Sequence, residues 1–351
     1  MRKYFWRLDN VELIFYQEKH KEIIEINKGD SDLYFLILNE DQKYVGYTGL
    51  SWINLKGGSA NCHIYIFDEF RRKGYGTKAI KIMLEYAFCE LRLHKINTSF
   101  KNNIPVDDFL FKLGFRYEGY RSKMFKENDK RINEDYYGII ESEYFNQSID
   151  RNKEPIISSF GKIEYESNAQ YSYIEKIDEY FLCNNLKFRG TNKEDCIKNN
   201  EMIFDSQVCR FFDDEVKLPG LLDIVDDYSI KHFNLAYYDE RIEFAIEEDN
   251  KYVGIVTLCG IDQKNQRTSS SIYIIPEARG RNIGKRAIQF AYSYAKEFLN
   301  CDTFFTCVSM GNIASARMMY KAGLKQTCTQ REAAFVGGKY VDTLFFELRW
   351  C

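Results

Sequence analysis

Hydrophobic and polar positions follow two patterns along the chain. Short apolar runs and alternations predict β-strands, and apolar positions at i, i+3 and i+4 predict amphipathic helices. In the first part, strands are predicted at residues 12–16, 33–38, 44–52, 60–67, 95–100, 115–120 and 136–144, and helices at 18–26, 78–91 and 106–113. In the last part, strands are predicted at 186–189, 270–275 and 303–308, hairpins at 244–258 and 325–349, and helices at 285–299 and 313–322. The elements therefore follow a similar order in both parts.

One stretch, a strand followed by a basic turn and the start of a helix at residues 272–288, occurs twice. Residues 64–80 match it at an offset of 208 positions, with Ile, Tyr, Ile, Glu, Arg, Gly, Ala and Ile in register. An offset of 209 then places Asn103 and Gly114 on Asn312 and Gly323. A repeat of this length, with one net insertion, indicates a duplicated domain rather than a short-period solenoid.

The repeat divides the chain into a first domain at 1–145, a linker segment at 146–184 and a second domain at 185–351. Within the linker segment, a strand is predicted at 156–166 and a helix at 171–182. The first copy is shorter, because 22 positions separate Leu13 from Phe35 whereas 57 separate Leu186 from Glu243. About 35 residues that are predicted to be helical in the second copy are thus absent from the first.

Composition restricts the class of protein. With 351 residues, 45% hydrophobic and 29% charged, the chain is long enough for two soluble domains that each bury a core. No apolar run reaches the roughly 18 residues of a membrane span, and the start lacks a signal peptide, so a cytoplasmic protein without a membrane partner is expected. A net charge of -3 argues against nucleic acid as a partner. The ten cysteines form no C-x-x-C pair, which favours reduced thiols and no metal site.

The repeated turn has the features of an anion site. Backbone N–H groups and the positive end of a helix dipole meet there, and glycine allows close approach of a ligand such as pyrophosphate. The first copy has Arg71, Gly74 and Gly76, and the second has Arg279, Asn282 and Gly284. Asparagine tolerates positive φ better than most residues, so the second turn is expected to keep its shape.

This arrangement, with R-x-x-G-x-G after Ile-Tyr-Ile, resembles the acetyl-CoA turn of the GNAT superfamily of N-acetyltransferases. Residues 312–324 likewise resemble the family's N-x-x-S-x-x-x-x-Y-x-x-G-F helix. The closing stretch at 331–342 and the opening at 186–195 resemble the ribosomal-protein-alanine acetyltransferase-like (RimJ/RimL) branch. The resemblance covers 185–350 and, in shortened form, 1–145.

The resemblance implies an α+β (α/β) fold of two GNAT-type domains. Each is a mixed, mostly antiparallel sheet with a splayed central strand pair, flanked by helices. Acetyl-CoA is implied as co-substrate, bound in the second domain by Ile272, Tyr273, Ile274, Arg279, Gly280, Arg281, Asn282, Ile283, Gly284, Lys285 and Asn312, and in the first by Ile64, Tyr65, Ile66, Arg71, Arg72, Lys73, Gly74, Tyr75, Gly76 and Asn103. Both copies are expected to bind it.

The implied reaction is direct transfer of an acetyl group to a primary amine of a small molecule or peptide, such as a peptide N-terminus, a polyamine or an amino sugar. Backbone N–H groups near 272–274 are expected to polarise the thioester carbonyl. By the resemblance, the Tyr320 hydroxyl protonates the leaving thiolate. A half-buried core aromatic is the alternative role for Tyr320, and the first copy has Phe111 at this position.

Three points stay open. No general base is assigned; in the first copy His63 is a candidate, with a purely structural histidine as the alternative. The carboxylates Asp213, Asp214, Glu215, Asp223, Asp226 and Asp227 predict either a wall for a cationic acceptor or a solvated loop. The second copy is expected to be catalytic and the first degenerate or regulatory, whereas the competing class is a non-catalytic acyl-CoA-binding or regulatory scaffold protein. The two domains are expected to pack together, and further oligomerisation is left open.

Overall fold

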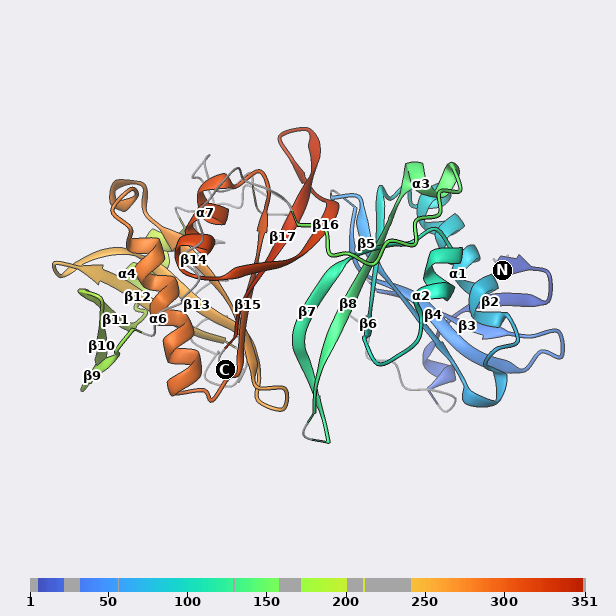
Figure 1. Cartoon of the computed structure of the whole chain (residues 1–351), viewed down its shortest axis with the longest axis horizontal. Coiled ribbons are helices and arrows are strands. Elements are labelled where there is room, and N and C mark those ends of the chain that lie inside the picture. The colour runs from blue at the N-terminus through green and yellow to red at the C-terminus, as the bar shows by residue number, and fades with distance from the viewer. Residues whose placement is uncertain are drawn as a thin grey trace. The chain divides into compact units, whose positions relative to one another are not determined.

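The computed structural model describes residues 6–21, 32–55, 57–128, 130–157, 172–200, 211 and 241–349. Two compact units contain them (Figure 1). The first unit comprises residues 1–119, 135–156 and 330–341, and the second comprises 120–134, 157–329 and 342–351. None of the described helices combines the length and the apolar character that crossing a membrane requires.

The first unit is built on a mixed sheet that is antiparallel from its first to its fifth strand and contains one parallel pair, the fifth strand with the sixth. Its strands are β1 (Trp6–Leu8), β2 (Val11–Phe15), β3 (Leu33–Leu38), β4 (Tyr44–Asn54), β5 (Ser59–Ile66) and β6 (Lys95–Lys101). Each pairs with the next in antiparallel fashion except β5 and β6, which are parallel. Its helical elements are η1 (Glu18–His20), η2 (Asp68–Phe70), α1 (Tyr75–Glu85), the π-helical turn η3 (Tyr86–Glu90), α2 (Asp107–Lys112) and α3 (Glu141–Phe145).

The second unit repeats this order. Its strands are β9 (Glu175–Ile177), β10 (Tyr180–Cys183), β11 (Leu186–Gly190), β12 (Arg241–Glu248), β13 (Lys251–Asp262), β14 (Arg267–Ile274) and β15 (Thr303–Ser309). Its described helical elements include α4 (Lys193–Asn200), η7 (Pro276–Ala278), α6 (Ile283–Glu297) and α7 (Ile313–Lys321). Neighbouring strands are antiparallel up to β14, which pairs in parallel with β15. Among the described residues of the two copies, the predicted order of elements is therefore confirmed, except that residues 141–144, predicted as the end of a strand, belong to α3.

The predicted splay of the central strand pair is present in both units. In the second unit, β14 pairs with β15 over three residues and the last pair is Ser269 with Phe305. In the first unit, the pairing of β5 with β6 likewise ends at Asn61 and Asn97. The remainder of β14 and of β5 has no parallel partner in these ladders, which leaves backbone groups open on that side.

A threonine side chain bonds the central strand just beyond the residue where each parallel ladder ends, where the two strands begin to separate. Thr306 Oγ1 donates to the carbonyl of Ser270 at 3.1 Å, and Thr98 Oγ1 donates to that of Cys62 at 2.9 Å. The two threonines lie at equivalent positions of the repeat. The same side-chain bond therefore separates the paired from the unpaired part of both central strands.

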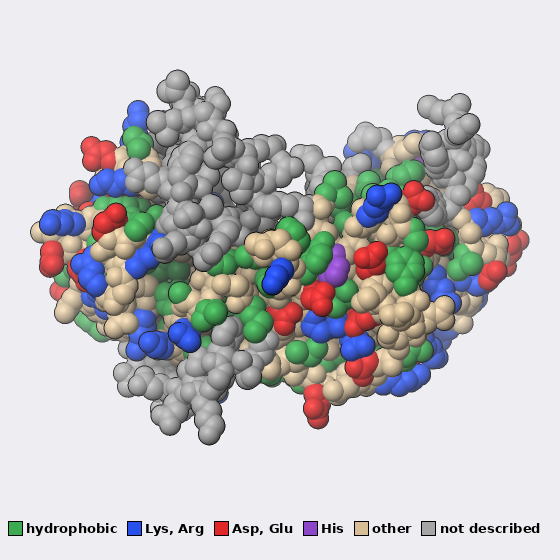
Figure 2. Space-filling model, turned by 90° about the horizontal axis from the view of Figure 1, so that it is seen from above, with side chains coloured by type: hydrophobic (Ala, Val, Ile, Leu, Met, Phe, Trp, Pro, Cys, Tyr) green, Lys and Arg blue, Asp and Glu red, His purple; other side chains and the backbone are tan. Residues whose placement is uncertain are grey.

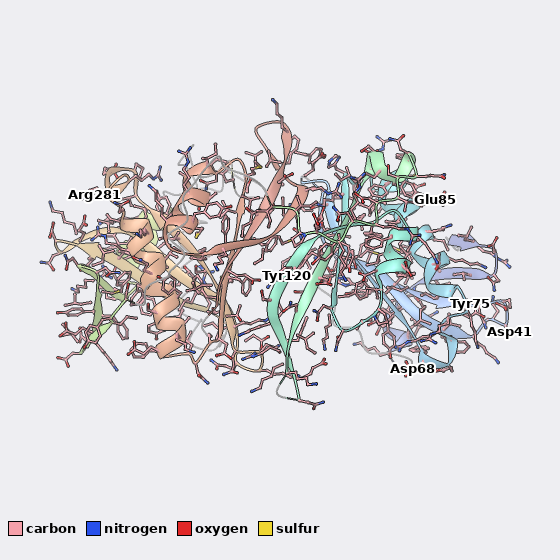
Figure 3. The ribbon with its side chains drawn as sticks, in the orientation of Figure 1. Asp41, Asp68, Tyr75, Glu85, Tyr120 and Arg281 are labelled. Atoms are coloured by element: carbon pink, nitrogen blue, oxygen red, sulfur yellow. The ribbon has the colours of Figure 1, made fainter. Side chains whose placement is uncertain are left out.

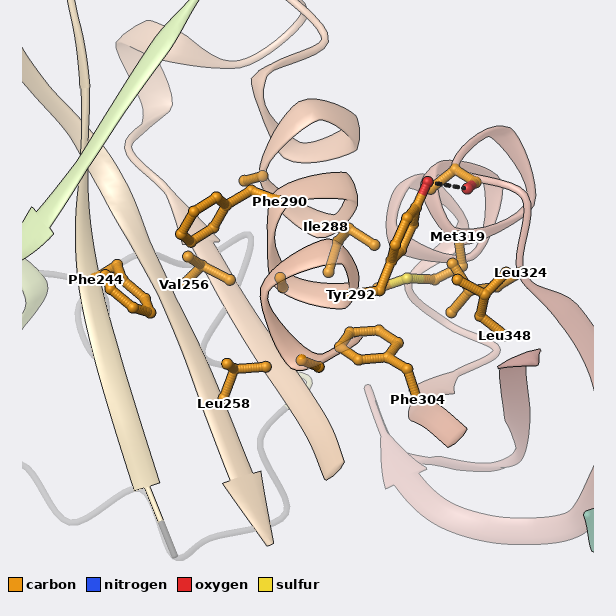
Figure 4. Close-up of a cluster of buried hydrophobic side chains, with 14 of the residues drawn as sticks. Phe244, Val256, Leu258, Ile288, Phe290, Tyr292, Phe304, Met319, Leu324 and Leu348 are labelled. Carbon is orange, nitrogen blue, oxygen red and sulfur yellow. Dashed lines mark hydrogen bonds between the residues drawn. The ribbon is translucent and has the colours of Figure 1, made fainter. Parts of the chain in front are cut away.

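The core of the second unit lies between its sheet and helices α6 and α7. Helix α6 runs along β13 and β14 (Figure 1). Figure 4 shows Phe290 of α6 facing Phe244 and Val256 of the sheet, while Tyr292 faces Met319 and Leu324. The apolar residues that alternate along the strands therefore pack in one core against the apolar residues spaced i, i+3, i+4 on α6.

Two β-hairpins each contribute to both units. Strands β7 (Arg116–Glu127) and β8 (Lys130–Ile140) form the first, and β16 (Lys325–Val336) and β17 (Lys339–Arg349), turned at Gly337-Gly338 as predicted, form the second. Residues 120–134 of the first hairpin belong to the second unit, and residues 330–341 of the second hairpin belong to the first. The compact units thus differ from the division by sequence repeats.

Polar side chains hold both hairpin tips inside their units. In the first unit, the Arg331 guanidinium donates to Glu118 Oε1 at 3.0 Å and to Glu143 Oε1 at 2.5 Å, and Lys95 Nζ lies 2.8 Å from Glu118 Oε1. In the second unit, Ser122 donates from its N and Oγ to the Glu347 carboxylate at 2.8 and 2.6 Å. Arg331 and Ser122 are equivalent in the repeat. Each unit therefore contains chain from both halves.

The prediction of a helix at 171–182 is wrong. Residues 175–183 instead form β9 and β10, and β10 pairs with β11 in antiparallel fashion. Asn184 and Asn185 connect β10 to β11 with φ of 50° and 59°, as a tight hairpin turn with two left-handed residues requires. This strand pairing overrides the helical spacing of the apolar residues. Most of the strand predicted at 156–166, and of the helix predicted at 18–26, lies outside the described residues.

Candidate functional site

The repeated turn has the same backbone shape in both units, with glycine at different places. In the first unit, Arg72 and Gly74 are left-handed, with φ of 61° and 84°. In the second unit, the equivalent residues Gly280 and Asn282 are left-handed, with φ of 79° and 59°. Each turn thus uses one glycine and one other residue for two left-handed positions, in opposite order. The expectation that Asn282 preserves the turn is confirmed.

An arginine fastens each turn to the strand before it. Arg279 Nε donates to the Ile274 carbonyl at 3.0 Å, and Arg71 Nε donates to the Ile66 carbonyl at the same distance. The two guanidinium groups lie 5.8 and 5.6 Å from the ring centroids of Tyr273 and Tyr65. The helices α6 and α1 begin directly after these turns, so their free N-terminal N–H groups meet the fastened loop.

In the second unit, the turn forms one wall of a cavity of about 540 Å³, and α7 forms another. Every residue predicted to bind acetyl-CoA in this domain lines the cavity except Arg281. These are Ile272, Tyr273, Ile274, Arg279, Gly280, Asn282, Ile283, Gly284, Lys285 and Asn312. Arg281 lies in the turn (Figure 3), where its Nη1 is 2.9 Å from Glu248 Oε2.

Sequence reasoning missed the part of the cavity that α7 contributes. Ala314, Ser315, Arg317, Met318 and Lys321 also line it. Their spacing from Asn312 follows one face of a helix, so the motif could have located them. With Arg279 and Lys285, the side chains Arg317 and Lys321 give the cavity four cations, which suits a ligand with several phosphates.

Asn312 has a structural role that Asn103 lacks. The side chain of Asn312 accepts a bond from the Ser315 N–H at 3.1 Å and caps α7. In the first unit, the equivalent helix α2 begins only at Asp107, and its N-cap residue Val106 has no side-chain acceptor for a cap bond. The structure therefore places the exposed Asn103 in the loop before α2 and not at its cap.

Tyr320 lies on the opposite face of α7 from the residues that line the cavity. Its side chain is 3% exposed, and its hydroxyl donates to Gln326 Oε1 at 2.5 Å. The ring belongs to the core of the second unit. Tyr320 is not among the residues that line the cavity, whereas the motif implies a hydroxyl beside the thioester.

The predicted residues of the first unit are positioned around its turn in a similar way. Gly76 lies in the first turn of α1, where an added Cβ would be 3.5 Å from Ile66 Cγ1. The Tyr75 side chain, at the start of α1 (Figure 3), is buried and its ring packs against Phe70. Lys73 Nζ lies 5.4 Å from the Phe70 ring centroid.

Other predicted features have less support in the structure. The acidic residues Asp213, Asp214, Glu215, Asp223, Asp226 and Asp227 lie outside the described residues. Within the described part of the chain, no group of His, Cys, Asp and Glu side chains has the arrangement of a metal site. On the face shown in Figure 2, described side chains of both charge signs are interspersed.

Two protein-family models match the chain. The model described as "Acetyltransferase (GNAT) family" matches residues 204–324, and the model described as "Acetyltransferase (GNAT) domain" matches residues 4–116. Together they cover more than half of the chain, and each match lies within one copy of the repeat.

Curated relatives carry related descriptions. The chain is 31% identical over 134 residues to the uncharacterized N-acetyltransferase YnaD of Bacillus subtilis, which covers 37% of this chain and 78% of that protein. It is 24% identical over 131 residues to the putative ribosomal N-acetyltransferase YdaF of the same organism, covering 37% and 72%.

Among solved structures, the spermidine N-acetyltransferase from Vibrio cholerae in complex with CoA and spermine matches with a TM-score of 0.43 and 17% identity, covering 47% of this chain and 95% of that one. The matches to the sequence agree with the repeated turn and the splayed strand pair of both units. The chain therefore belongs to the GNAT family of N-acetyltransferases and contains two copies of its domain.

Proposed function

We propose that the second domain carries the catalytic site and that the cavity between the β14–α6 turn and α7 holds acetyl-CoA. The acceptor is a primary amine, of the peptide N-terminus, polyamine or amino-sugar type. One observation carries this proposal: the predicted turn, the open part of β14 and four cationic side chains line a single cavity. The cations suit binding of CoA, and the open strand adds N–H groups that can stabilise charge on a reacting carbonyl.

The turn and the cations suit the phosphates of CoA. Backbone N–H groups at the start of α6 can donate hydrogen bonds to an anion, and the helix dipole favours negative charge there. Arg279, Lys285, Arg317 and Lys321 add positive charge around the same cavity. Binding of the phosphates in this way directs the thioester along β14, toward the point where β14 and β15 separate.

The open part of β14 suits the reaction itself. Beyond Ser269, the edge of β14 that faces β15 is not paired with it in the parallel ladder. Its N–H groups can stabilise the oxyanion that forms when an amine nitrogen attacks the thioester carbon, an effect of roughly 3 to 4 kcal/mol. The new C–N bond then replaces the C–S bond, and the thiolate leaves.

The Tyr320 hydroxyl has a different place in this proposal from the one that the motif implies. It is buried and donates to Gln326. We assign Tyr320 a packing role and leave protonation of the thiolate to solvent or to the incoming amine. A substitution that removes only the hydroxyl separates the two assignments.

The proposal predicts free thiol from acetyl-CoA in the presence of a reactive amine. A panel of primary amines, with peptide, polyamine and amino-sugar members, is added to the full chain while CoA thiol is measured. Release above the rate of spontaneous hydrolysis, with a matching acetylated amine by mass spectrometry, supports the proposal. Binding of acetyl-CoA without transfer to any member of the panel contradicts it and supports the scaffold interpretation.

The acidic residues at 213–227 motivate a second part of the proposal, that the acceptor is cationic. Negative charge near an acceptor site attracts a cationic amine, and salt weakens that attraction. The apparent affinity for a cationic amine is therefore expected to fall as salt rises. Equal rates with neutral and cationic amines, without salt dependence, contradict this part.

The first domain is proposed to bind CoA as well, because its turn has the same two left-handed positions and the same arginine bond as the second. Calorimetry of the full chain is expected to show two sites, one of which Gly76→Glu removes by steric block and charge repulsion. A single site that only Gly284→Glu removes contradicts this proposal.

A further inference from the structure

Four aromatic side chains cover one face of the sheet in the first unit. Tyr34 of β3 stacks on His63 of β5, with ring centroids 6.4 Å apart and an interplanar angle of 18°. Tyr47 of β4 stacks on Tyr65 of β5 at 5.6 Å and 26°, and Tyr34 lies 6.3 Å from Tyr47. The four rings, which we call the aromatic face, thus form a continuous layer over three neighbouring strands.

The strand register places the aromatic face opposite the core. Gly49 pairs with both Tyr34 and His63, so these three residues point to the same side of the sheet. A Cβ on Gly49 would lie 2.6 Å from Cδ1 of Tyr34, so only glycine leaves room for that ring to lie across β4. The core residues Phe35 and Cys62 neighbour Tyr34 and His63 in sequence and therefore point to the other side.

The second domain does not repeat this face. At the equivalent positions it has Ile242, Ile255 and Ser271 where the first has Tyr34, Tyr47 and His63. Only Tyr65 has an aromatic counterpart, Tyr273, and their exposures differ: Tyr65 is 41% exposed and Tyr273 is 5% exposed. The aromatic face is thus specific to the first copy and is partly open to solvent.

The charges beside the aromatic face suit a cation. Asp32 accepts a bond from the Trp52 N–H at 3.1 Å and interacts electrostatically with both Tyr34 and His63. Although His63 is exposed by surface area, partial desolvation of its ring lowers its pKa and outweighs the opposing effect of Asp32, which favours the uncharged imidazole beside a cation. The His63 Nε2 is bonded to Ser51 Oγ. The Arg71 guanidinium already lies over the ring of Tyr65, so one ring of the aromatic face already contacts a cation.

We propose that the aromatic face of the first domain binds the ammonium group of an amine, through the faces of Tyr34 and Tyr47 and the carboxylate of Asp32. Aromatic rings attract cations through their negative faces, and the attraction grows when the cation is partly desolvated. His63 lies two residues beyond Asn61, the last β5 residue that pairs with β6, so the site lies at the open end of the splay. The inference rests on the proposed function only in its choice of an amine as ligand.

Histidine NMR on the full chain tests this proposal directly. The chain has four histidines, so ¹⁵N-histidine labelling gives few ring signals, and His63→Ser, which installs the residue of the second domain, identifies the His63 signals. The probe is 1,4-diaminobutane, and 1,4-butanediol is its uncharged control. Acetyl-CoA is omitted, so no turnover is needed and a failure of the proposed catalysis does not affect the result.

The diamine is expected to shift the His63 signals in a saturable way, and the diol is expected to leave them unchanged. Tyr34→Ile with Tyr47→Ile, the residues of the second domain, is expected to raise the Kd about tenfold. Asp32→Asn keeps the acceptor for the Trp52 N–H and is expected to raise the Kd and remove most of its salt dependence. Tyr173→Ile, at an exposed tyrosine of the second unit, is the matched control and is expected to leave the Kd unchanged.

Three outcomes would overturn the proposal. These are no shift with the diamine, an equal shift with the diol, and an unchanged Kd in the double isoleucine variant. If the double variant does not fold, the Asp32→Asn variant tests the site, because this substitution alters no packed ring. An unchanged Kd in the Asp32→Asn variant then contradicts the proposal.

Discussion

The Tyr320 ring meets the Phe346 ring edge to face, with centroids 4.9 Å apart and an interplanar angle of 84°. The equivalent pair in the first unit is Phe111 and Tyr137, at 6.2 Å and 63°. In the second unit the residue with the hydroxyl, Tyr320, is on the helix, whereas in the first unit it is Tyr137, on the strand. Tyr320 donates to Gln326 and Tyr137 donates to Asp107. Both copies therefore use this pair as a core contact that contains one hydroxyl.

Tyr320→Phe is accordingly predicted to cost about 1 kcal/mol of unfolding free energy, because one hydrogen bond is lost. The rate constant kcat is predicted to stay within about threefold of the wild type. Denaturant unfolding and steady-state kinetics measure the two quantities. A loss of kcat of roughly 10²-fold, with unchanged affinity for acetyl-CoA, would instead establish the proton-donor role that the motif implies.

The turn before α6 provides a second prediction. Asn282 has φ of 59°, and a left-handed conformation costs a β-branched residue roughly 1 to 2 kcal/mol. Asn282→Val is predicted to lose about that much stability and to weaken acetyl-CoA binding, whereas Asn282→Gly is predicted to preserve both. Calorimetry with acetyl-CoA tests the pair, and equal affinity in the two variants contradicts the role of the left-handed residue.

The hairpin tip at 330–341 provides a third prediction. Arg331→Ala leaves the buried carboxylates of Glu118 and Glu143 with fewer partners, while Lys95 and Arg116 still pair with them. We expect a loss of about 3 kcal/mol, the lower end for breaking a buried ion pair. Glu332→Gln is the control on the same strand. Its partner His94 is 2.6 Å away, but the Glu332 side chain is 44% exposed, so a loss below about 1 kcal/mol is expected.

Equal stability of the Arg331→Ala and Glu332→Gln variants would show that the hairpin tip adds little to the first unit. Chemical denaturation of the full chain, followed by a probe in each unit, makes the comparison. A loss confined to the probe of the first unit is the expected pattern, since Arg331 belongs to that unit.

The pKa of His63 provides a prediction for pH. Desolvation of the ring lowers the pKa of the folded state below the ordinary value of 6.5, so the unfolded chain binds a proton more readily. The contribution of His63 to stability is therefore complete above pH 6.5 and declines as pH falls below it. NMR titration of the labelled histidines is expected to give His63 a midpoint below 6.5, and a midpoint at or above that value contradicts the desolvation of the ring beside Tyr34.

The parts of the fold that follow local chemistry could be predicted from the sequence. Gly74 and Asn282 identify the turns because few residues tolerate a left-handed backbone. The prediction of the central strands is confirmed in both copies, because their apolar residues alternate. The cavity wall at 272–285 follows from the position of the turn. The Asn184-Asn185 pair gave a hairpin signal that the apolar spacing at 171–182 obscured.

Other features depend on tertiary contacts that no local pattern encodes. The spacing on α7 separates a cavity face, with Asn312, Ser315 and Met318, from a core face with Tyr320, but a motif matched letter by letter ignores that separation. Nothing near Arg331 or Ser122 in the sequence indicates that each hairpin tip belongs to the unit of the other half. The aromatic face becomes apparent only when β3, β4 and β5 are placed side by side.

The central claim is that acetyl transfer takes place at the cavity of the second domain, and thiol release by two matched variants tests it most directly. A Cβ on Gly284 would already lie 2.4 Å from Met318 Sδ inside the cavity, so a carboxylate there competes with phosphate for the same space. With acetyl-CoA and a reactive amine, Gly284→Glu is predicted to lower the rate by roughly 10²-fold or more, whereas Gly76→Glu is predicted to stay within about threefold of the wild type. The reverse result, activity lost with Gly76→Glu and kept with Gly284→Glu, would place the reaction in the first domain and contradict the account.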